Sequence, residues 1–163
     1  MILADTSALV TLASAEVIET VADEFDLHTT QVVVSELRDT AEHEDVHGEA
    51  AQRVLEQSDE IDVHETGDSG FESSRIDEGE ASCIVLTRRI EADFLITDDL
   101  RALPEVRELV EAKVAISPIV LKALVKRRVL QPEQAGEKLS TMAERRDWLG
   151  APIYRRAKAL FDS

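Results

Sequence analysis

The chain has 163 residues, of which 44% are hydrophobic and only 4% aromatic, and its formal net charge at pH 7 is −16. This length suits a single domain, and the scarcity of aromatic residues leaves Val, Leu, Ile and Ala to form the core, which favours helices packed on a sheet. One cysteine excludes an internal disulfide, and the longest apolar runs, such as 114–121, fall well short of the roughly 20 residues that span a bilayer. Without a basic and apolar leader at Met1, we expect a cytoplasmic protein without a membrane segment.

Acidic and basic residues are divided unevenly along the chain. Residues 1–100 hold 26 acidic and 5 basic side chains, whereas residues 101–163 hold 8 and 13. The acidity and the preference for Arg over Lys are typical of a halophilic protein's solvated surface. A nucleic-acid enzyme needs acids where metals bind and bases where phosphates pass, so the division suits one. The same division of charge would arise equally if acidic surface helices happened to lie in the first part of the chain and basic helices in the second.

Short apolar runs predict five strands that are separated by residues at helical spacing. The expected strands lie at 1–5, 27–29, 61–63, 94–96 and 114–116, and acids alternating with Ile61 and Val63 indicate an exposed or edge strand. The expected helices in this part lie near 8–13, 15–25, 32–37, 50–55, 80–86 and 104–110. Alternating strands and helices imply right-handed crossovers and a parallel sheet covered on both faces. Residues 1–117 are thus predicted to form a three-layer α/β/α core.

Capping residues and prolines mark where several of these helices begin. Thr6 or Ser7 is expected to cap the first helix, Ser14 the second and Thr30 the third. The stretch 39–48 is almost wholly polar, with Gly48 stopping any helix there, and 67–74 reads as a loop.

Beyond Ser117, which is expected to cap a helix beginning at Pro118, the pattern is helical to the end of the chain. Further helices are expected at 132–150 and 152–161. We therefore predict that residues 118–163 form a helical tail packed on the core, so that 1–163 is a single domain.

Acidic residues follow the predicted strands at the edge of the sheet where ligands bind. Asp5 ends the first strand, and Asp98 and Asp99 follow the fourth, so all three should reach the same rim. Glu36 and Glu80, on helices, can face that rim. Gathered carboxylates repel one another unless cations lie among them, and hard divalent cations prefer oxygen ligands. The sequence therefore predicts Mg2+ or Mn2+ at a carboxylate cluster, where bound water could attack a phosphodiester.

Four segments at these positions resemble the PIN-domain family in order and spacing. They are Leu3-Ala-Asp-Thr-Ser7, Val34-Ser-Glu-Leu37, Asp77-Glu-Gly-Glu-Ala81 and Ala92-Asp-Phe-Leu-Ile-Thr-Asp-Asp99. With the helical tail, the chain is similar to the toxin-like PIN nucleases of prokaryotes over roughly residues 1–160. The resemblance implies a PIN-like fold, a metal-dependent endoribonuclease activity and an RNA substrate. An antitoxin protein and a second copy of the chain are the candidate protein partners.

The resemblance also implies roles for individual residues. Asp5, Glu36 and Glu80 would be catalytic metal ligands, with a fourth ligand from the Thr97-Asp-Asp99 segment. The family pattern Thr-x-Asp favours Asp99, but Asp98 is also acidic and leaves the choice open. Thr6, Ser7 and Thr97 would help to hold a water or a phosphate.

Basic clusters in the second half are candidates for phosphate contacts. They lie at 126–128, 145–146 and 155–156. We single out Arg145 and Arg146 as substrate-binding residues, with the alternative that such residues pair with acids or with helix C-termini.

Two other functions compete with the nuclease. His43-Glu44-Asp-Val-His47 fits the His-Glu-x-x-His pattern of zinc peptidases, but its setting is acidic instead of apolar and Gly48 follows at once. The second alternative is a catalytically silent PIN-fold protein that binds RNA or protein. Retention of every acid argues against this loss of activity.

Overall fold

The structure, a computed structural model, describes residues 1–68 and 75–162. Within these residues it contains one sheet of five parallel strands in the order β3-β2-β1-β4-β5. The strands are β1 (Ile2–Ala4), β2 (Leu27–Thr30), β3 (Asp62–His64), β4 (Phe94–Ile96) and β5 (Lys113–Ala115). All five lie where the apolar runs predicted them, and β3 is an edge strand as its alternating pattern indicated. The central strand β1 is buried along its whole length.

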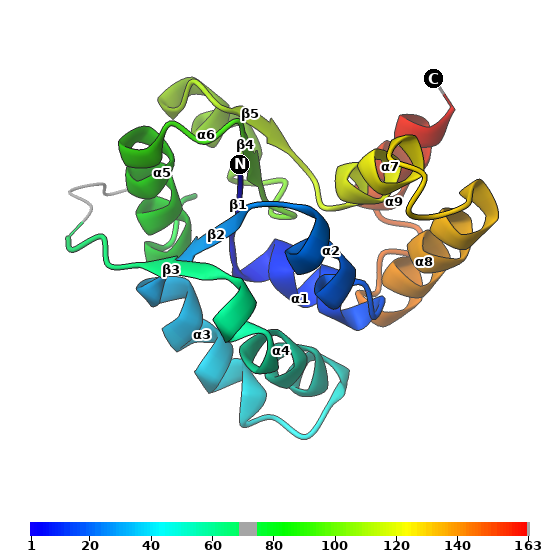
Figure 1. The fold of residues 1–163 in the computed structure, drawn as a ribbon, viewed down its shortest axis with the longest axis horizontal. Coiled ribbons are helices and arrows are strands. Elements are labelled where there is room, and N and C mark those ends of the chain that lie inside the picture. The colour runs from blue at the N-terminus through cyan, green and yellow to red at the C-terminus, as the bar shows by residue number, and fades with distance from the viewer. Residues whose placement is uncertain (69–74, 163) are drawn as a thin grey trace.

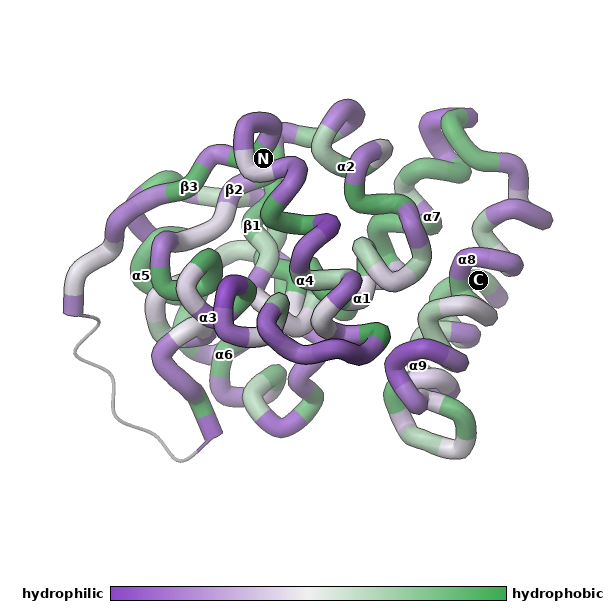
Figure 2. Tube along the Cα trace, turned by 90° about the horizontal axis from the view of Figure 1, so that it is seen from below, coloured by the Kyte–Doolittle hydropathy of each residue, from purple (hydrophilic) through white to green (hydrophobic). Residues whose placement is uncertain are grey.

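Helices cover this sheet in the predicted three-layer α/β/α arrangement (Figure 1). In the described residues they are α1 (Thr6–Ser14), α2 (Ile18–Glu24), α3 (Gln31–Ala41), α4 (Val46–Glu56), α5 (Glu78–Ile90), α6 (Leu103–Leu109), α7 (Pro118–Lys126), α8 (Pro132–Arg145) and α9 (Pro152–Phe161), with a 3-10 turn η1 at Ser58–Glu60. Helix α5 contacts β1 and β2, whereas α1, α3 and α4 contact one another. In Figure 2, the interior strand β1 is drawn in the green tones of hydrophobic residues.

Side-chain caps fix the start of four helices, α1, α3, α4 and α5. Four N-cap side chains accept hydrogen bonds from backbone amides of the first turn: Asp5 from Ala8, Thr30 from Val33, Asp45 from Gly48 and Asp77 from Glu80. Thr30 was predicted, but the prediction of Thr6 or Ser7 for α1 is wrong, because the Asp5 carboxylate already occupies the N-cap position.

Three other helix boundaries differ from the sequence-based prediction. Ser14 does not cap α2; it is the last residue of α1, and its hydroxyl donates to the carbonyl of Thr11. Gly48 does not stop a helix but lies inside α4, where a Cβ would collide with the carbonyl oxygen of His43. Helix α8 ends at Arg145 instead of Gly150, because Asp147 adopts the left-handed conformation with φ 57°. Ser117 precedes α7 as expected, but its side chain makes no capping bond.

Helices α7, α8 and α9 form a group on one side of the molecule (Figure 1), and α8 contacts α1. Two arginines connect this group to the C-terminal ends of earlier helices, where carbonyl oxygens lack helical partners. Arg145 Nη1 donates to the carbonyl of Ser14 at 2.6 Å, and Arg127 Nη1 donates to the carbonyl of Glu24 at 2.6 Å. The division into a core of residues 1–117 and a tail of 118–163 stays a prediction.

Of the loop predicted at 67–74, residues 69–74 lie outside the described residues. In the part that is described, none of the helices combines the length and hydropathy needed to cross a bilayer.

Candidate active site

A pocket of about 410 Å³ lies at the carboxyl ends of β1 and β4, where the sequence predicted the site. Its lining residues are Asp5, Thr6, Ser7, Val10, Glu36, Thr40, His47, Asp77, Glu80, Asp99 and Arg146. The segments that follow β1, β2, β3 and β4 thus bring together the four acids that were predicted as metal ligands. The structure also places Thr6, Ser7 and Arg146 at this pocket, but not Thr97, Asp98 or Arg145.

Asp5 lies at the centre of a hydrogen-bond network at the end of β1. Its Oδ1 accepts from the backbone amide of Ala8 at 3.0 Å and from the hydroxyl of Ser7 at 2.8 Å, while its Oδ2 accepts from the hydroxyl of Thr97. Burial nonetheless raises the pKa of Asp5 from 3.8 to about 7, because the loss of hydration outweighs these hydrogen bonds. The carboxylate is therefore fixed in orientation but costly to ionise without a cation.

Glu36 faces the pocket from α3, and two neighbours determine its position. The hydroxyl of Thr6 donates to Glu36 Oε1. Gly79, in the first turn of α5, lies against the same carboxylate, and a Cβ at position 79 would lie 2.2 Å from Oε1. Burial raises the pKa of Glu36, and Asp77 adds repulsion. Because Gly79 has no Cβ, it leaves the space that the Glu36 carboxylate occupies.

Glu80 and Asp99 form a carboxyl pair across the pocket. Glu80 is the third residue of α5, and its Oε2 accepts from the backbone amide of Asp77 at 3.3 Å in a capping box. Burial, followed by a hydrogen bond with Asp99, raises the pKa of Glu80 to about 9. Burial and the neighbouring carboxylates therefore favour the protonated form of Glu80.

Asp98 and Asp99, which the sequence could not distinguish, point in different directions. Asp99 lines the pocket, and its Oδ1 accepts from the backbone amide of Arg101 at 2.9 Å. Asp98 Oδ1 instead accepts from the backbone amide of Ser117 at 2.7 Å, and its buried Oδ2 has no hydrogen-bond partner among the described residues. Asp98 therefore connects the end of β4 to the start of α7 and lies outside the pocket.

The adjacent residues Arg145 and Arg146 have different surroundings. Arg146 Nε donates to the hydroxyl of Thr11 at 3.0 Å. Burial lowers the pKa of Arg146, and the nearby carboxylates of Asp98 and Asp5 oppose this shift. Arg145 contacts the carbonyl of Ser14 instead. Arg146 thus brings a cation to the acidic pocket, and Arg145 joins α8 to α1.

Comparison with known proteins gives one family. A family model described as PIN domain matches residues 1–163, the whole chain. The chain belongs to the PIN-domain family. Searches among curated proteins and among solved structures gave no significant match. Proteins with a PIN domain are generally nucleases that bind nucleic acid and use divalent metals.

The pocket of this PIN domain fits hard divalent cations. Its donors are carboxylate oxygens, which Mg2+ and Mn2+ prefer, and any protonated carboxyl would release its proton to solvent when a cation binds. The four acids surround the pocket instead of converging on one point. Among the described residues, no three of their oxygen atoms come within 4.8 Å of one another. Besides burial, Asp99 raises the pKa of Glu80 by repulsion, so a cation between these two side chains would relieve it.

Sequence reasoning missed two of the titratable residues that line the PIN-domain pocket, Asp77 and His47. Asp77 lies at its edge as the N-cap of α5, and the pattern Asp-x-x-Glu of a capping box could have identified it. His47 lies in the first turn of α4, lines the pocket and has a buried Nε2 without a partner among the described residues. His43 lies before α4, so the two histidines do not share one helix as the peptidase motif requires.

Proposed function

We propose that this PIN domain is a Mg2+- or Mn2+-dependent endoribonuclease that hydrolyses RNA without a covalent enzyme intermediate. The observation that carries the proposal is the presence of Asp5, Glu36, Glu80 and Asp99 around one pocket that Arg146 also lines. A bound divalent cation would lower the pKa of a water molecule and neutralise charge on phosphodiester oxygens. The toxin role and an antitoxin partner belong to the same proposal and derive from the resemblance of the sequence to toxin-like PIN proteins.

The residues around the ligands would act by orienting them. The hydroxyls of Ser7 and Thr97 donate to opposite oxygens of Asp5 and thereby fix the plane of its carboxylate. Thr6 donates to Glu36 in the same way. Such outer hydrogen bonds typically contribute roughly 10–100-fold to metal affinity. Besides their predicted role in holding substrate, the hydroxyls of Thr6, Ser7 and Thr97 would thus position the metal-binding carboxylates.

Arg146 would bind substrate phosphate. The pocket is acidic and repels a polyanion, so a fixed cation at its edge gives the backbone of RNA a favourable point of contact. Helix α8 and the hydroxyl of Thr11 hold this guanidinium in place. Arginine suits the task because its planar donors match phosphate oxygens in pairs.

The proposal is tested by cleavage of single-stranded RNA by the purified full chain. We expect cleavage with Mg2+ or Mn2+, none in excess EDTA, and recovery when the metal is restored. Glu80→Gln should lower the rate by roughly 100-fold or more, since losing a ligand exceeds the effect of an outer residue. Glu78→Gln is the matched control, because Glu78 is exposed in the same turn of α5.

Three outcomes would contradict this function. Cleavage undiminished in excess EDTA would refute the metal mechanism. RNA binding without cleavage under every metal condition would favour the silent PIN-fold protein. Zinc-dependent peptide cleavage that is lost in His43→Ala would favour the peptidase.

A further inference from the structure

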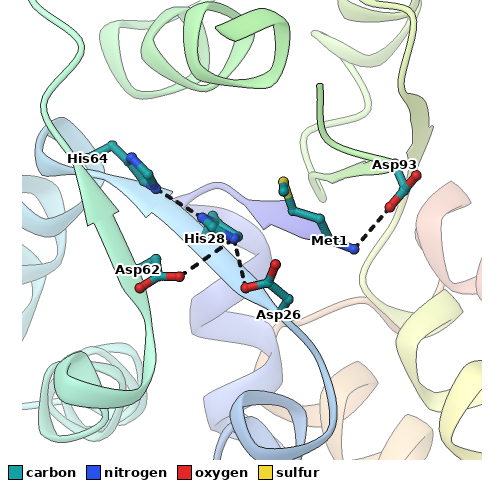
Figure 3. Close-up of polar contacts among 6 residues, drawn as sticks. All are labelled: Met1, Asp26, His28, Asp62, His64 and Asp93. Atoms are coloured by element: carbon teal, nitrogen blue, oxygen red, sulfur yellow. Dashed lines mark hydrogen bonds and ion pairs between the residues drawn. The ribbon is translucent and has the colours of Figure 1, made fainter. Parts of the chain in front are cut away.

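A second group of potential metal ligands lies at the amino ends of β2 and β3, at the opposite end of the sheet from the pocket. It comprises Asp26, His28 and Asp62, and in each of these residues one ligand atom lies within 4.8 Å of the other two. Asp26 immediately precedes β2, and Asp62 begins the edge strand β3, where it is paired in register with His28. Figure 3 shows the His28 ring between the two carboxylates, with His64 on its other side.

We infer that Asp26, His28 and Asp62 form a cation site for a zinc-type dication, held by one imidazole nitrogen and two carboxylates. His28 Nε2 lies 2.8 Å from Asp26 Oδ1 and 3.7 Å from Asp62 Oδ2. Zinc binds N and O ligands at about 2.0–2.2 Å, which places tetrahedral ligand atoms about 3.4 Å apart. The two observed separations lie on either side of this value, so small movements of the carboxylates would suffice.

The ligands differ in exposure in a way that favours binding. The side chain of His28 is only 9% exposed and is held in the sheet, whereas those of Asp26 and Asp62 are 56% and 68% exposed. A fixed imidazole therefore directs the site, and the two carboxylates can adjust to it. Solvent can fill the remaining coordination position.

His64 supplies the outer contact that a metal-binding histidine needs. Its Nε2 lies 2.9 Å from His28 Nδ1, and the two rings stack with centroids 5.2 Å apart. When His28 Nδ1 carries the proton and donates to His64, the lone pair of Nε2 faces Asp26 and Asp62. Metal-bound histidines usually donate their second N–H to an acceptor in the protein or to water, which fixes ring and tautomer, and His64 Nε2 offers an acceptor here. His64 is thus a positioning residue.

Charge at this site also favours a cation. In residues 1–68 and 75–162, no lysine or arginine forms an ion pair with Asp26 or Asp62; each of these carboxylates is paired with His28 alone. Imidazole with carboxylate suits zinc, whereas Mg2+ prefers oxygen ligands alone. The two sites of the chain therefore select different metals. A bound zinc would join the edge strand β3 to β2.

The test is calorimetric titration of metal-free full chain with Zn2+ in the presence of excess Mg2+, which occupies the carboxylate pocket. We expect zinc binding by the wild type. Asp62→Asn and Asp26→Asn should each weaken it by roughly 100-fold or more, and His64→Ala by roughly 10–100-fold. Asp93→Asn is the control, because Asp93 pairs with the N-terminal amine at 3.0 Å, apart from the cluster (Figure 3).

A thermal melt of each variant without zinc will establish that it folds. Zinc should then raise the melting temperature of the wild type and of Asp93→Asn, but not that of Asp62→Asn, because only a folded state with the site gains from binding. Equal zinc affinity in Asp62→Asn and Asp93→Asn would overturn the inference. So would the absence of zinc binding by the wild type in excess Mg2+, whether or not the chain cleaves RNA.

Discussion

Replacing Asp5 by Asn should have opposite effects on activity and on the stability of the metal-free protein. The unfolded chain ionises Asp5 near 3.8, whereas burial raises the pKa in the folded protein to about 7. The folded state therefore holds a proton that the unfolded state has lost, and the free energy of unfolding falls as pH rises from about 4 to about 7. The difference of about 3 in pKa corresponds to about 4 kcal/mol at high pH.

Asn cannot ionise, so Asp5→Asn removes this penalty. The advantage of the variant should grow by about 3 kcal/mol between about pH 5 and about pH 8, because the penalty accumulates only up to pH 7. Asn can still accept the hydrogen bond from Ala8, since Asn and Asp are similar N-caps. Its amide nitrogen would face the hydroxyl of Thr97, which now donates to Asp5, and this mismatch should offset about 1 kcal/mol.

The measurement is urea denaturation of both proteins in EDTA at the two pH values. Asp45→Asn is the matched control, because Asp45 is also a helix N-cap and accepts from Gly48 at 2.8 Å, yet it is exposed and outside the pocket. Mg2+ should stabilise the wild type and Asp45→Asn but not Asp5→Asn, which should also lose cleavage. A stability difference between Asp5→Asn and the wild type that did not change between the two pH values would refute this reasoning.

Two further comparisons use neighbouring residues as each other's control. Asp99→Asn should weaken Mg2+ binding and lower cleavage by roughly 100-fold or more, whereas Asp98→Asn should keep cleavage within a few-fold of the wild type. Both effects are measured by initial rates over a series of Mg2+ concentrations. An equal loss of cleavage in the two variants would make Asp98 a ligand too. Arg146→Gln should weaken RNA binding and flatten the dependence of log K on log salt by about 0.7 for each lost phosphate contact. Arg145→Gln should instead lower the free energy of unfolding by about 1 kcal/mol and leave the salt dependence of RNA binding unchanged, because Arg145 contacts Ser14. If only Arg145→Gln changed the salt dependence, Arg145 and not Arg146 would be the residue that binds phosphate.

The strands and the acids at their ends could be predicted because both depend on short-range patterns. A largely buried run such as 94–96 is followed by a turn, and an acid in that turn lies near the rim of the sheet. The boundaries of α1, α4 and α8 were harder to predict. The starts of α1 and α4 depend on which of several adjacent polar groups reaches a free backbone amide, and Asp5 competes directly with Thr6 and Ser7 for that place. The end of α8 depends instead on the left-handed backbone of Asp147.

The finer arrangement of the site could not be predicted, because it depends on how distant elements pack. The choice between Asp98 and Asp99 follows from the contact of Asp98 with the amide of Ser117 at the start of α7. The different surroundings of Arg145 and Arg146 follow from the way α8 lies on α1. The cluster around His28 requires β2 and β3 to pair in one register, which the alternating pattern of β3 does not specify.

Gly79 shows how a residue without functional atoms can be required by chemistry alone. Glycine in a helix costs about 1 kcal/mol relative to alanine, so selection for a firmer α5 would replace it. The group that a new methyl would displace is the flexible end of Glu36, which can rotate away at little cost to the fold. The damage would fall on the carboxylate that Thr6 orients. In evolutionary terms, selection for stability and selection for activity act in opposite directions at position 79. A lineage freed from catalysis could gain stability there by one substitution, whereas an active one must retain the weaker helix.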